Sequence, residues 1–464
     1  MKIYNTLTGK KQEFKPIQDG KVKMYSCGIT VSGEAHIGHA YQALIYDIIR
    51  KYLEKKGYDV TYARNYTDVD DKIIAKSNET GIPADKYAKM MIDNIDAQMR
   101  RLKVDDPTVW LKATESIDDI IAFVSTLIEK GHAYPTEKGD VYFSVESFPE
   151  YGKLSHRNLE DAMNGVRVDN DEMKKNPLDF ALWKSAKAGE PSWTSPWGDG
   201  RPGWHIECST MNKKAFGEEI DIHGGGRDLI FPHHENEIAQ TEALTGKQFA
   251  KYWIHNGLIK VNGQKMSKSL GNSLFLKDLL DAYSPEVIKF ALLQTNYRGD
   301  INVTDNLFPD AEKHLYEFHK VIKSAVDKFG ALNGVSEQID DEFDKAMDDD
   351  FNTALAISNL YGYFKSAKAK INSGDQSVLA DLNSIVKTYS LIGLFTTDSQ
   401  EFIKSVEEKS QKSELPSEVV ALAEERKGAR AEKNWAKSDE LRDKINALGY
   451  DIKDSKDGYT LTKK

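Results

Sequence analysis

The chain has 464 residues, of which 40% are hydrophobic and 29% charged, and it carries a formal net charge of −10. This length and composition are typical of a globular protein with two or three domains. We find no apolar run close to the roughly 20 residues of a membrane span and no signal peptide, so we expect a cytoplasmic protein without a membrane partner. The acidic balance argues against non-specific coating of nucleic acid, but it allows a local basic face.

The first predicted unit is a strand, a helix and a second strand. The stretch "KVKMYSCGIT" at 21–30 predicts a buried strand, the apolar spacing over 38–57 predicts a helix capped by Gly57, and 59–68 predicts the next strand. This order implies a parallel sheet with a ligand crevice at the carboxyl ends of its strands. We therefore predict an α/β fold with a Rossmann-like sheet.

The rest of the chain predicts further domains. We expect a catalytic sheet domain over 1–300 with an insertion at about 105–225, followed by a helical bundle over 301–404. Residues 405–464 are expected to form a linker and a small C-terminal module, because 405–417 is polar and charged.

Two histidines, His36 and His39, fall where the first strand gives way to the helix. A helix N-terminus presents unpaired backbone N–H groups and the positive end of the dipole, so it attracts phosphate. Side chains three residues apart share one side of the first turn, and Gly38 lets a base or sugar approach the backbone. A nucleotide site is predicted, with two surface histidines brought together by chance as the alternative.

A basic loop with Lys265, Ser267 and Lys268 follows about 230 residues later. Lysines three apart on a loop can reach a triphosphate and neutralise charge that develops at phosphorus; the alternative is an ordinary solvated loop. Together, "HIGH" and "KMSKS" resemble the signatures of class I aminoacyl-tRNA synthetases. That resemblance implies ATP chemistry.

The two cysteines are far apart in the sequence: Cys27 ends the first predicted strand, and Cys208 lies near the start of a predicted helix. The stretch "HHENE" at 233–237 opens another predicted helix. Two thiolates, an imidazole and a carboxylate would form a tetrahedral zinc site. Spacing alone leaves the histidine open, because Glu237 is four residues from His233 and three from His234. The alternative is two buried cysteines that act as small apolar side chains.

Five long motifs, "CGIT…HIGHA", "RNYTDVDDKII", "PGWHIECS", "DIHGGGRDLIFPHHENEIAQ" and "NGQKMSKSLGN", resemble the cysteinyl-tRNA synthetase family in its compact bacterial form. The resemblance implies ATP with Mg²⁺, L-cysteine and tRNA-Cys as substrates, and one zinc ion per chain. It implies the zinc ligands Cys27, Cys208, His233 and Glu237. In that family zinc binds the substrate thiolate, which separates cysteine from serine better than pocket shape could.

Around this metal we expect Gly28, Thr67 and Trp204 to contact the substrate cysteine, while His223 and Asp228 hold its ammonium or the ATP ribose. Ordinary core packing is the alternative for Trp204. The acidic "TDVDDK" stretch is also compatible with helix-capping carboxylates.

In the last module, Arg426, Arg430, Lys433 and Lys437 predict one basic helix face with Trp435 nearby, suited to anticodon phosphates and a stacked base. A solvated charged helix is the alternative, since acidic residues are interleaved there.

The resemblance implies a monomeric cysteine–tRNA ligase. Two other functions remain as alternatives: a paralogous ATP-dependent cysteine ligase with a non-tRNA acceptor, and a non-catalytic tRNA-binding or zinc regulatory protein.

Overall fold

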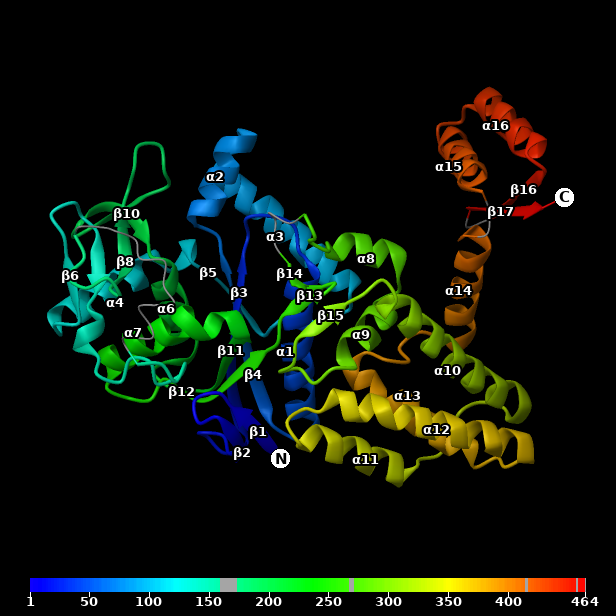
Figure 1. Cartoon of the computed structure of the whole chain (residues 1–464), viewed down its shortest axis with the longest axis horizontal. Helices are drawn as coiled ribbons and strands as arrows, with labels where there is room; N and C mark the ends of the chain where they lie inside the picture. The colour runs from blue at the N-terminus through cyan, green and yellow to red at the C-terminus, as the bar shows by residue number, and fades with distance from the viewer. Residues whose placement is uncertain (159–172, 267–270, 414–415, 456–457, 464) are drawn as a thin grey trace. The chain divides into compact units, whose positions relative to one another are not determined.

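The computed structural model describes residues 1–158, 173–266, 271–413, 416–455 and 458–463 (Figure 1). It divides into two compact units. Met1–Ala311 with Ala331–Thr396 form the first, and Glu312–Gly330 with Thr397–Lys464 form the second.

The centre of the first unit is a five-stranded sheet in the order β12-β11-β3-β4-β5, in which every neighbouring pair is parallel. Its strands are β3 (Lys21–Thr30), β4 (Asp59–Thr67), β5 (Val109–Lys112), β11 (Ile220–Gly226) and β12 (Ala250–Asn256). Helix α1 (Ile37–Lys55) connects β3 to β4, and Gly57 follows it with a φ of 92°. The predicted strand–helix–strand unit and the α/β fold are confirmed.

The apolar runs of β3 and β4 are buried because both faces of a parallel sheet are covered. The pairing of these two strands shifts register between Ser26 and Ile29. This bulge sets Cys27 and Gly28 apart from the regular ladder at the carboxyl end of the sheet.

The segment of the chain between β5 and helix α6 (Trp204–Phe216) forms a second sheet. This sheet is antiparallel, and its strands are in the order β6-β7-β8-β10-β9. Its strands are β6 (Ala133–Pro135), β7 (Val141–Phe143), β8 (Phe180–Ser185), β9 (Trp193–Ser195) and β10 (Gly198–Pro202). One apolar core joins this sheet to the parallel one and includes Trp183, Trp253 and both cysteines. The predicted 105–225 insertion contains this sheet.

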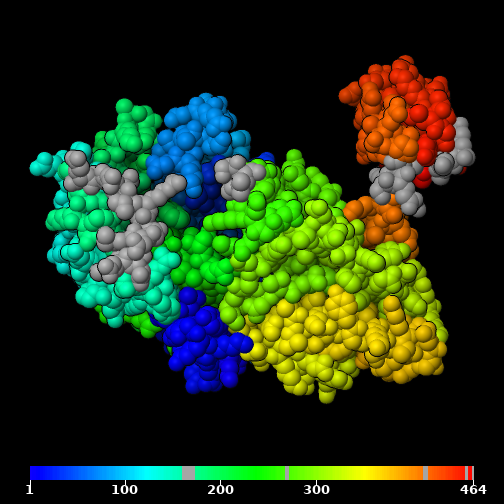
Figure 2. Space-filling view, viewed as in Figure 1, coloured from blue at the N-terminus to red at the C-terminus, as the bar shows by residue number. Residues whose placement is uncertain are grey.

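Other elements of the first unit are β1 (Lys2–Asn5), β2 (Lys10–Glu13), α2 (Asp71–Thr80), α3 (Ala84–Arg101), α4 (Ile117–Glu129), α7 (Glu235–Thr245), β13 (Ile259–Val261), β14 (Gln264–Lys265), α8 (Leu276–Ala282), α9 (Pro285–Leu293), β15 (Ile301–Val303), α11 (Glu337–Asp348), α12 (Thr353–Ser373) and α13 (Val378–Tyr389). On the surface, α2 lies beside the insertion (Figure 2), and Asp71 of α2 pairs with Lys184 of β8.

Asp70 caps α2 by accepting a hydrogen bond from the Lys72 N–H, so the capping interpretation of "TDVDDK" is confirmed for this residue.

Asp350 connects three distant parts of the first unit. Its carboxylate accepts hydrogen bonds from the Tyr4 N–H at 2.8 Å, the Tyr297 hydroxyl at 2.9 Å and Arg298 Nε at 2.9 Å. The residue is fully buried, so these three donors compensate for the loss of water around the charge.

The second unit contains most of α10 (Leu307–Phe329), together with α14 (Ser399–Ser413), α15 (Ser417–Ala431), α16 (Trp435–Ala447), β16 (Tyr450–Ser455) and β17 (Gly458–Lys463). Residues 405–413, predicted as part of a linker, are helical in α14. A small core of Val419, Ala423, Ile445 and Tyr450 holds the last two helices and the hairpin together.

Candidate active site

The paired histidines begin α1 and cap it. His36 is the N-cap residue, and its Nδ1 accepts a hydrogen bond from the Gly38 N–H at 3.1 Å. The His36 N–H in turn donates to His39 Nδ1 at 3.4 Å, and the two rings stack with centroids 3.6 Å apart. In a neutral imidazole whose Nδ1 accepts, Nε2 carries the proton. Both rings therefore present an Nε2–H donor at a helix N-terminus, as a phosphate requires.

The chain just after the basic loop contacts this helix start. The Ile37 N–H donates to the Leu274 carbonyl at 2.9 Å, and the Leu276 N–H donates to the Ala35 carbonyl at 2.9 Å. A Cβ built at Gly38 would lie 3.0 Å from the His36 ring and 3.6 Å from Met266 Cε. Glycine here thus leaves space for the capping ring.

Of the predicted residues in this loop, Lys265 ends β14 and is exposed. Ser267 and Lys268 lie outside the described residues. Their predicted contacts with ATP stay predictions.

A buried cluster of side chains that could hold a metal ion lies near the carboxyl ends of β3 and β11. Cys27, Cys208, His233 and Glu237 bring their ligand atoms within 4.8 Å of one another. Glu237 Oε1 lies 3.2 Å from Cys27 Sγ and 3.1 Å from His233 Nε2. Ligand atoms around a tetrahedral zinc ion lie roughly 3.3–3.8 Å apart for bonds of about 2.0–2.3 Å, so these residues fit zinc.

The charges in this cluster favour metal binding. Although burial opposes ionisation, His223 and His233 hold the pKa of Glu237 well below its usual range. A hydrogen bond from the Cys27 thiol lowers the pKa of Cys208 to about 6, while burial raises the pKa of Cys27. Although burial lowers the pKa of His233, the charge of Glu237 raises it to about 10. One thiolate and one carboxylate are thus ready for a cation, and binding would displace the protons of Cys27 and His233.

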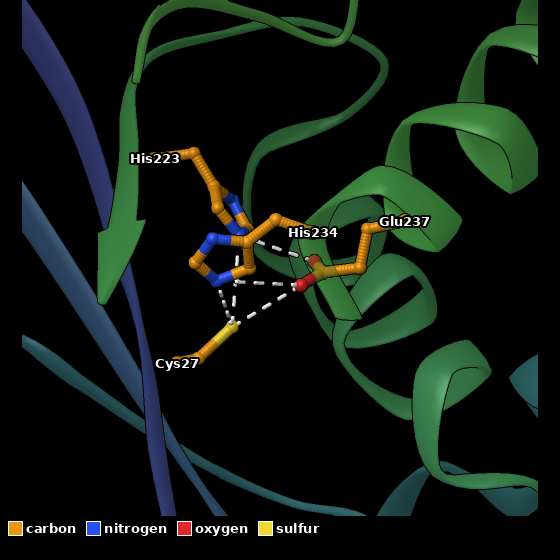
Figure 3. A group of neighbouring side chains, drawn as sticks. All are labelled: Cys27, His223, His234 and Glu237. Atoms are coloured by element: carbon orange, nitrogen blue, oxygen red, sulfur yellow. Dashed lines mark hydrogen bonds and ion pairs between the residues drawn. The ribbon is translucent and has the colours of Figure 1, made fainter. Parts of the chain in front are cut away.

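A second set of side chains shares two of these residues. Cys27 and Glu237 also face His223 and His234 (Figure 3). His234 Nε2 lies 3.3 Å from Cys27 Sγ, and His223 Nε2 lies 3.1 Å from Glu237 Oε2. His223 therefore lies against the thiol cluster, the name used below for Cys27, Cys208, His233 and Glu237. Asp228, which was predicted to bind the same ammonium or ribose as His223, is exposed beyond the end of β11.

The three residues predicted to contact the substrate cysteine border this cluster. The Gly28 N–H donates to Asn65 Oδ1 at 2.8 Å, and Thr67 Oγ1 donates to Glu207 Oε2 at 3.0 Å. The ring centroid of Trp204 lies 4.4 Å from that of His233, and Trp204 is 39% exposed. Trp204 is thus available to a ligand.

Two residues that contact the site, Asn65 and His205, were not predicted from the sequence. Asn65 Oδ1 also accepts from the Tyr25 hydroxyl at 3.0 Å, and His205 Nδ1 lies 3.0 Å from His233 Nδ1. Asn65 lies in the buried part of β4, where a polar side chain requires a hydrogen-bond partner, and this was a usable signal.

The predicted tRNA contacts divide between two helices. Arg426 and Arg430 lie on α15, Lys433 lies in the turn, and Trp435 and Lys437 lie on α16, so the single basic helix face is wrong. The helix breaks because Lys433 takes a φ of 59° and the Asn434 side chain caps α16 by accepting from the Lys437 N–H.

Arg426 is also buried, where it makes a bidentate pair with Asp454 at 2.7 and 3.1 Å. The guanidinium of Arg430 lies 5.4 Å from the ring of Trp435, which is 56% exposed. Lys437 is exposed and pairs with Glu425 at 2.7 Å. Among the described residues, no helix is long and apolar enough to cross a membrane.

Comparisons with known proteins cover nearly the whole chain. Residues 13–313 match the family described as "tRNA synthetases class I (C) catalytic domain", residues 342–396 match "DALR domain", and residues 412–460 match "Cysteinyl-tRNA ligase anticodon binding domain". A protein of Syntrophotalea carbinolica named cysteine–tRNA ligase is 45% identical over 99% of this chain and 98% of its own length. One of the same name from Geobacter sulfurreducens is 45% identical over 99% of each chain.

Solved structures of lower identity share the fold. The methionyl-tRNA synthetase of Mycobacterium tuberculosis in complex with methionyl-adenylate has a TM-score of 0.58 at 13% identity, covering 80% of this chain and 89% of its own. The LeuRS–tRNA–LeuAMS complex of Agrobacterium radiobacter K84 has a TM-score of 0.59 at 11% identity, covering 83% and 87%. The catalytic-domain match and the relatives that are 45% identical over 99% of the chain establish that the chain belongs to the class I cysteinyl-tRNA synthetase (cysteine–tRNA ligase) family.

Proposed function

We propose that the chain, as a cytoplasmic monomer, activates L-cysteine with ATP and Mg²⁺ and transfers it to tRNA-Cys. In the first step the carboxylate of cysteine attacks the α-phosphorus of ATP, giving cysteinyl adenylate and pyrophosphate. In the second step the 2′-hydroxyl of the terminal adenosine attacks the adenylate carbonyl, and AMP leaves. Both steps depend on positioning and electrostatics rather than on a covalent enzyme intermediate.

Cys27, Cys208, His233 and Glu237 would hold a zinc ion in the buried cluster. When bound, zinc supplies a Lewis acid that prefers a thiolate to a neutral hydroxyl, so it favours cysteine over serine. Gly28, Thr67 and Trp204 enclose the substrate, and Asp228 is proposed to contact its ammonium or the ATP ribose. His223 is not proposed for that role, because both of its ring nitrogens already face Asn212 and Glu237.

The Nε2–H groups of His36 and His39 donate to the phosphates of ATP at the start of α1, where Gly38 leaves room. Lys265, Ser267 and Lys268 are proposed to bind the same triphosphate and to stabilise the charge that develops as pyrophosphate leaves.

In the C-terminal module, we assign anticodon contacts to Arg430, Lys433, Trp435 and Lys437. Arg426 supports them by holding Asp454, which also lies 3.3 Å from the Arg430 guanidinium.

The observation that carries the proposal is the convergence of two thiols, an imidazole and a carboxylate beside Trp204. The test is cysteine-dependent exchange of pyrophosphate into ATP, with serine as the control and zinc assayed in parallel. We expect exchange with cysteine, little with serine, and about one zinc per chain. Folded, zinc-loaded protein without exchange would favour the non-catalytic alternative.

A further inference from the structure

A line of polar side chains runs from the turn after β1 to the thiol cluster. We propose that Thr6, at the outer end of this line, is a positioning residue for the zinc site. Its hydroxyl sets the tautomers of two buried histidines, His255 and His234, so that the inner one donates a hydrogen bond to the thiolate of Cys27. This inference rests on the proposed function and deepens it, because it assigns residues that support the proposed metal.

Each contact along this line is within hydrogen-bonding distance. Thr6 Oγ1 lies 2.8 Å from His255 Nδ1. His255 Nε2 lies 2.7 Å from His234 Nδ1, and His234 Nε2 lies 3.3 Å from Cys27 Sγ (Figure 3). Both histidines and the cysteine are buried, whereas Thr6 is half-buried. Because a buried polar group needs a hydrogen-bond partner, each ring is satisfied by the contacts of its two nitrogens in this line.

A metal bound by Cys27 determines the direction of these hydrogen bonds. The metal ligand is a thiolate, which can only accept, so His234 must donate to it from Nε2. Burial favours the neutral form of both rings, and a neutral imidazole has one N–H group. Nδ1 of His234 therefore accepts from Nε2 of His255. Nδ1 of His255 then accepts as well, and the proton in that contact comes from the hydroxyl of Thr6.

The backbone around Thr6 holds its hydroxyl against the outer ring. The Thr6 N–H donates to the Trp253 carbonyl at 2.9 Å, and the Thr6 carbonyl lies 3.0 Å from His156 Nε2. Trp253 lies two residues before His255 on β12, so the turn is fastened to the strand that carries the ring. The ring of Trp253 also packs against that of His234, with centroids 5.4 Å apart. Close packing of this kind leaves the rings little freedom to turn away from one another.

Removal of the Thr6 hydroxyl would release this order. His255 could then carry its proton on Nδ1, and His234 would donate to it from its own Nδ1. The unprotonated Nε2 of His234 would in that case face the sulfur of Cys27, and two lone pairs would repel each other. Partners that orient the groups around a metal ligand typically contribute about 10–100-fold to metal affinity or activity.

The test compares Thr6→Val, which replaces the hydroxyl with a methyl group, and Thr6→Ser, which keeps the hydroxyl. Thr6→Val is expected to lower zinc affinity about tenfold in competition with a chromogenic chelator. In the cobalt-substituted protein it should shift the thiolate-to-cobalt absorption band, because the donor to Cys27 is lost. In cysteine-dependent pyrophosphate exchange it should raise KM for cysteine severalfold and leave KM for ATP unchanged. Thr6→Ser should restore all three values.

The matched control is Thr8→Val in the same turn. The Thr8 hydroxyl donates to the Asn5 carbonyl at 3.3 Å and does not belong to the line of side chains. Thr8→Val should therefore keep the zinc affinity and the cobalt spectrum of the unaltered chain. If Thr6→Val does not fold, Thr6→Ala serves in its place.

A double substitution separates the hydrogen-bonded line from simple anchoring of the turn. In His255→Gln, the side-chain amide can donate to His234 without help from Thr6. Thr6→Val should then cause no further loss of zinc affinity when it is added to His255→Gln, whereas loss of an anchor would be additive.

The inference is overturned if Thr6→Val keeps the zinc affinity and cobalt spectrum of the unaltered chain. It is also overturned if Thr6→Ser or Thr8→Val loses as much zinc affinity as Thr6→Val, or if the losses in the double variant add. A failure of the proposed function looks different, because exchange would then be absent from the unaltered chain, whereas zinc affinity and the cobalt spectrum can be measured without it.

Discussion

Asn212 Nδ2 donates a hydrogen bond to Nδ1 of His223 at 2.9 Å. Because Nδ1 accepts, Nε2 of His223 carries the proton, and this is the atom that faces Glu237 Oε2 at 3.1 Å. His223 is thus set to support the carboxylate rather than to bind a metal. Of the two overlapping side-chain sets, the one with Cys208 and His233 is the better zinc site.

Substitution of single side chains tests which of the two sets binds zinc. Cys208→Ala should lower zinc affinity more than about 100-fold, whereas His223→Gln, outside the coordination sphere, should lower it only about tenfold. Competition with a chromogenic chelator measures both, and His132→Gln in the insertion is the control. Equal losses for Cys208→Ala and His223→Gln would contradict the assignment.

Gly28→Ala should disrupt the site by steric conflict. A Cβ at this position would lie 1.5 Å from the Asn65 carbonyl oxygen, and the parallel ladder around it cannot yield. We expect the free energy of unfolding to fall by more than about 3 kcal/mol, at the upper end of overpacking effects. Gly362→Ala in α12 is the control, because its Cβ meets nothing within 4 Å, and it should stabilise the helix by about 0.5–1 kcal/mol. Urea unfolding followed by tryptophan fluorescence measures both.

The buried Lys289 predicts a dependence of stability on pH. Burial, reinforced by the nearby charge of Lys51, lowers the pKa of Lys289 to about 8, and its ammonium donates to the Lys103 carbonyl at 2.6 Å. At Lys289 the unfolded chain therefore binds more protons between about pH 8 and 10.5, so the contribution of this residue to stability should rise with pH in that window, by up to about 3 kcal/mol. Lys289→Met should flatten this rise in urea titrations, and the exposed Lys277→Met should retain it.

Asp350→Ala should be strongly destabilising. It would leave the Tyr297 hydroxyl and the Tyr4 N–H without their acceptor and Arg298 without its ion pair. Removing one partner of a buried ion pair costs about 3–5 kcal/mol. Denaturant unfolding measures this loss, and Asp305→Ala, an exposed aspartate before α10, is the control. A loss below about 1 kcal/mol would mean that water replaces these contacts.

Local sequence patterns predicted the structural features that depend only on residues close together in the sequence. The apolar runs predicted β3 and β4 nearly to the residue, and the spacing of the histidines predicted that they share one side of the first helical turn, because both features follow from the geometry of one element. The zinc ligand set came from family resemblance, since spacing left His233 and His234 open. Asn65 and Asn212 could not be paired with their partners in advance, because they act across strands and helices. The prediction of a single basic helix face was wrong because a new helix begins after Asn434, a residue type that is favoured as a helix N-cap.

The residues of the thiol cluster are made at very different times during synthesis. Cys27 and Glu237 are 210 positions apart, and the cluster draws on the end of β3, on α6 and on α7. During synthesis from the N-terminus, Cys27 emerges long before the residues that complete the cluster. A metal captured there would close a very long loop and fasten the insertion's flanking helix to the sheet. Metal binding by the complete cluster would thus come late in synthesis, after β3, β4, β5 and β11 have been made.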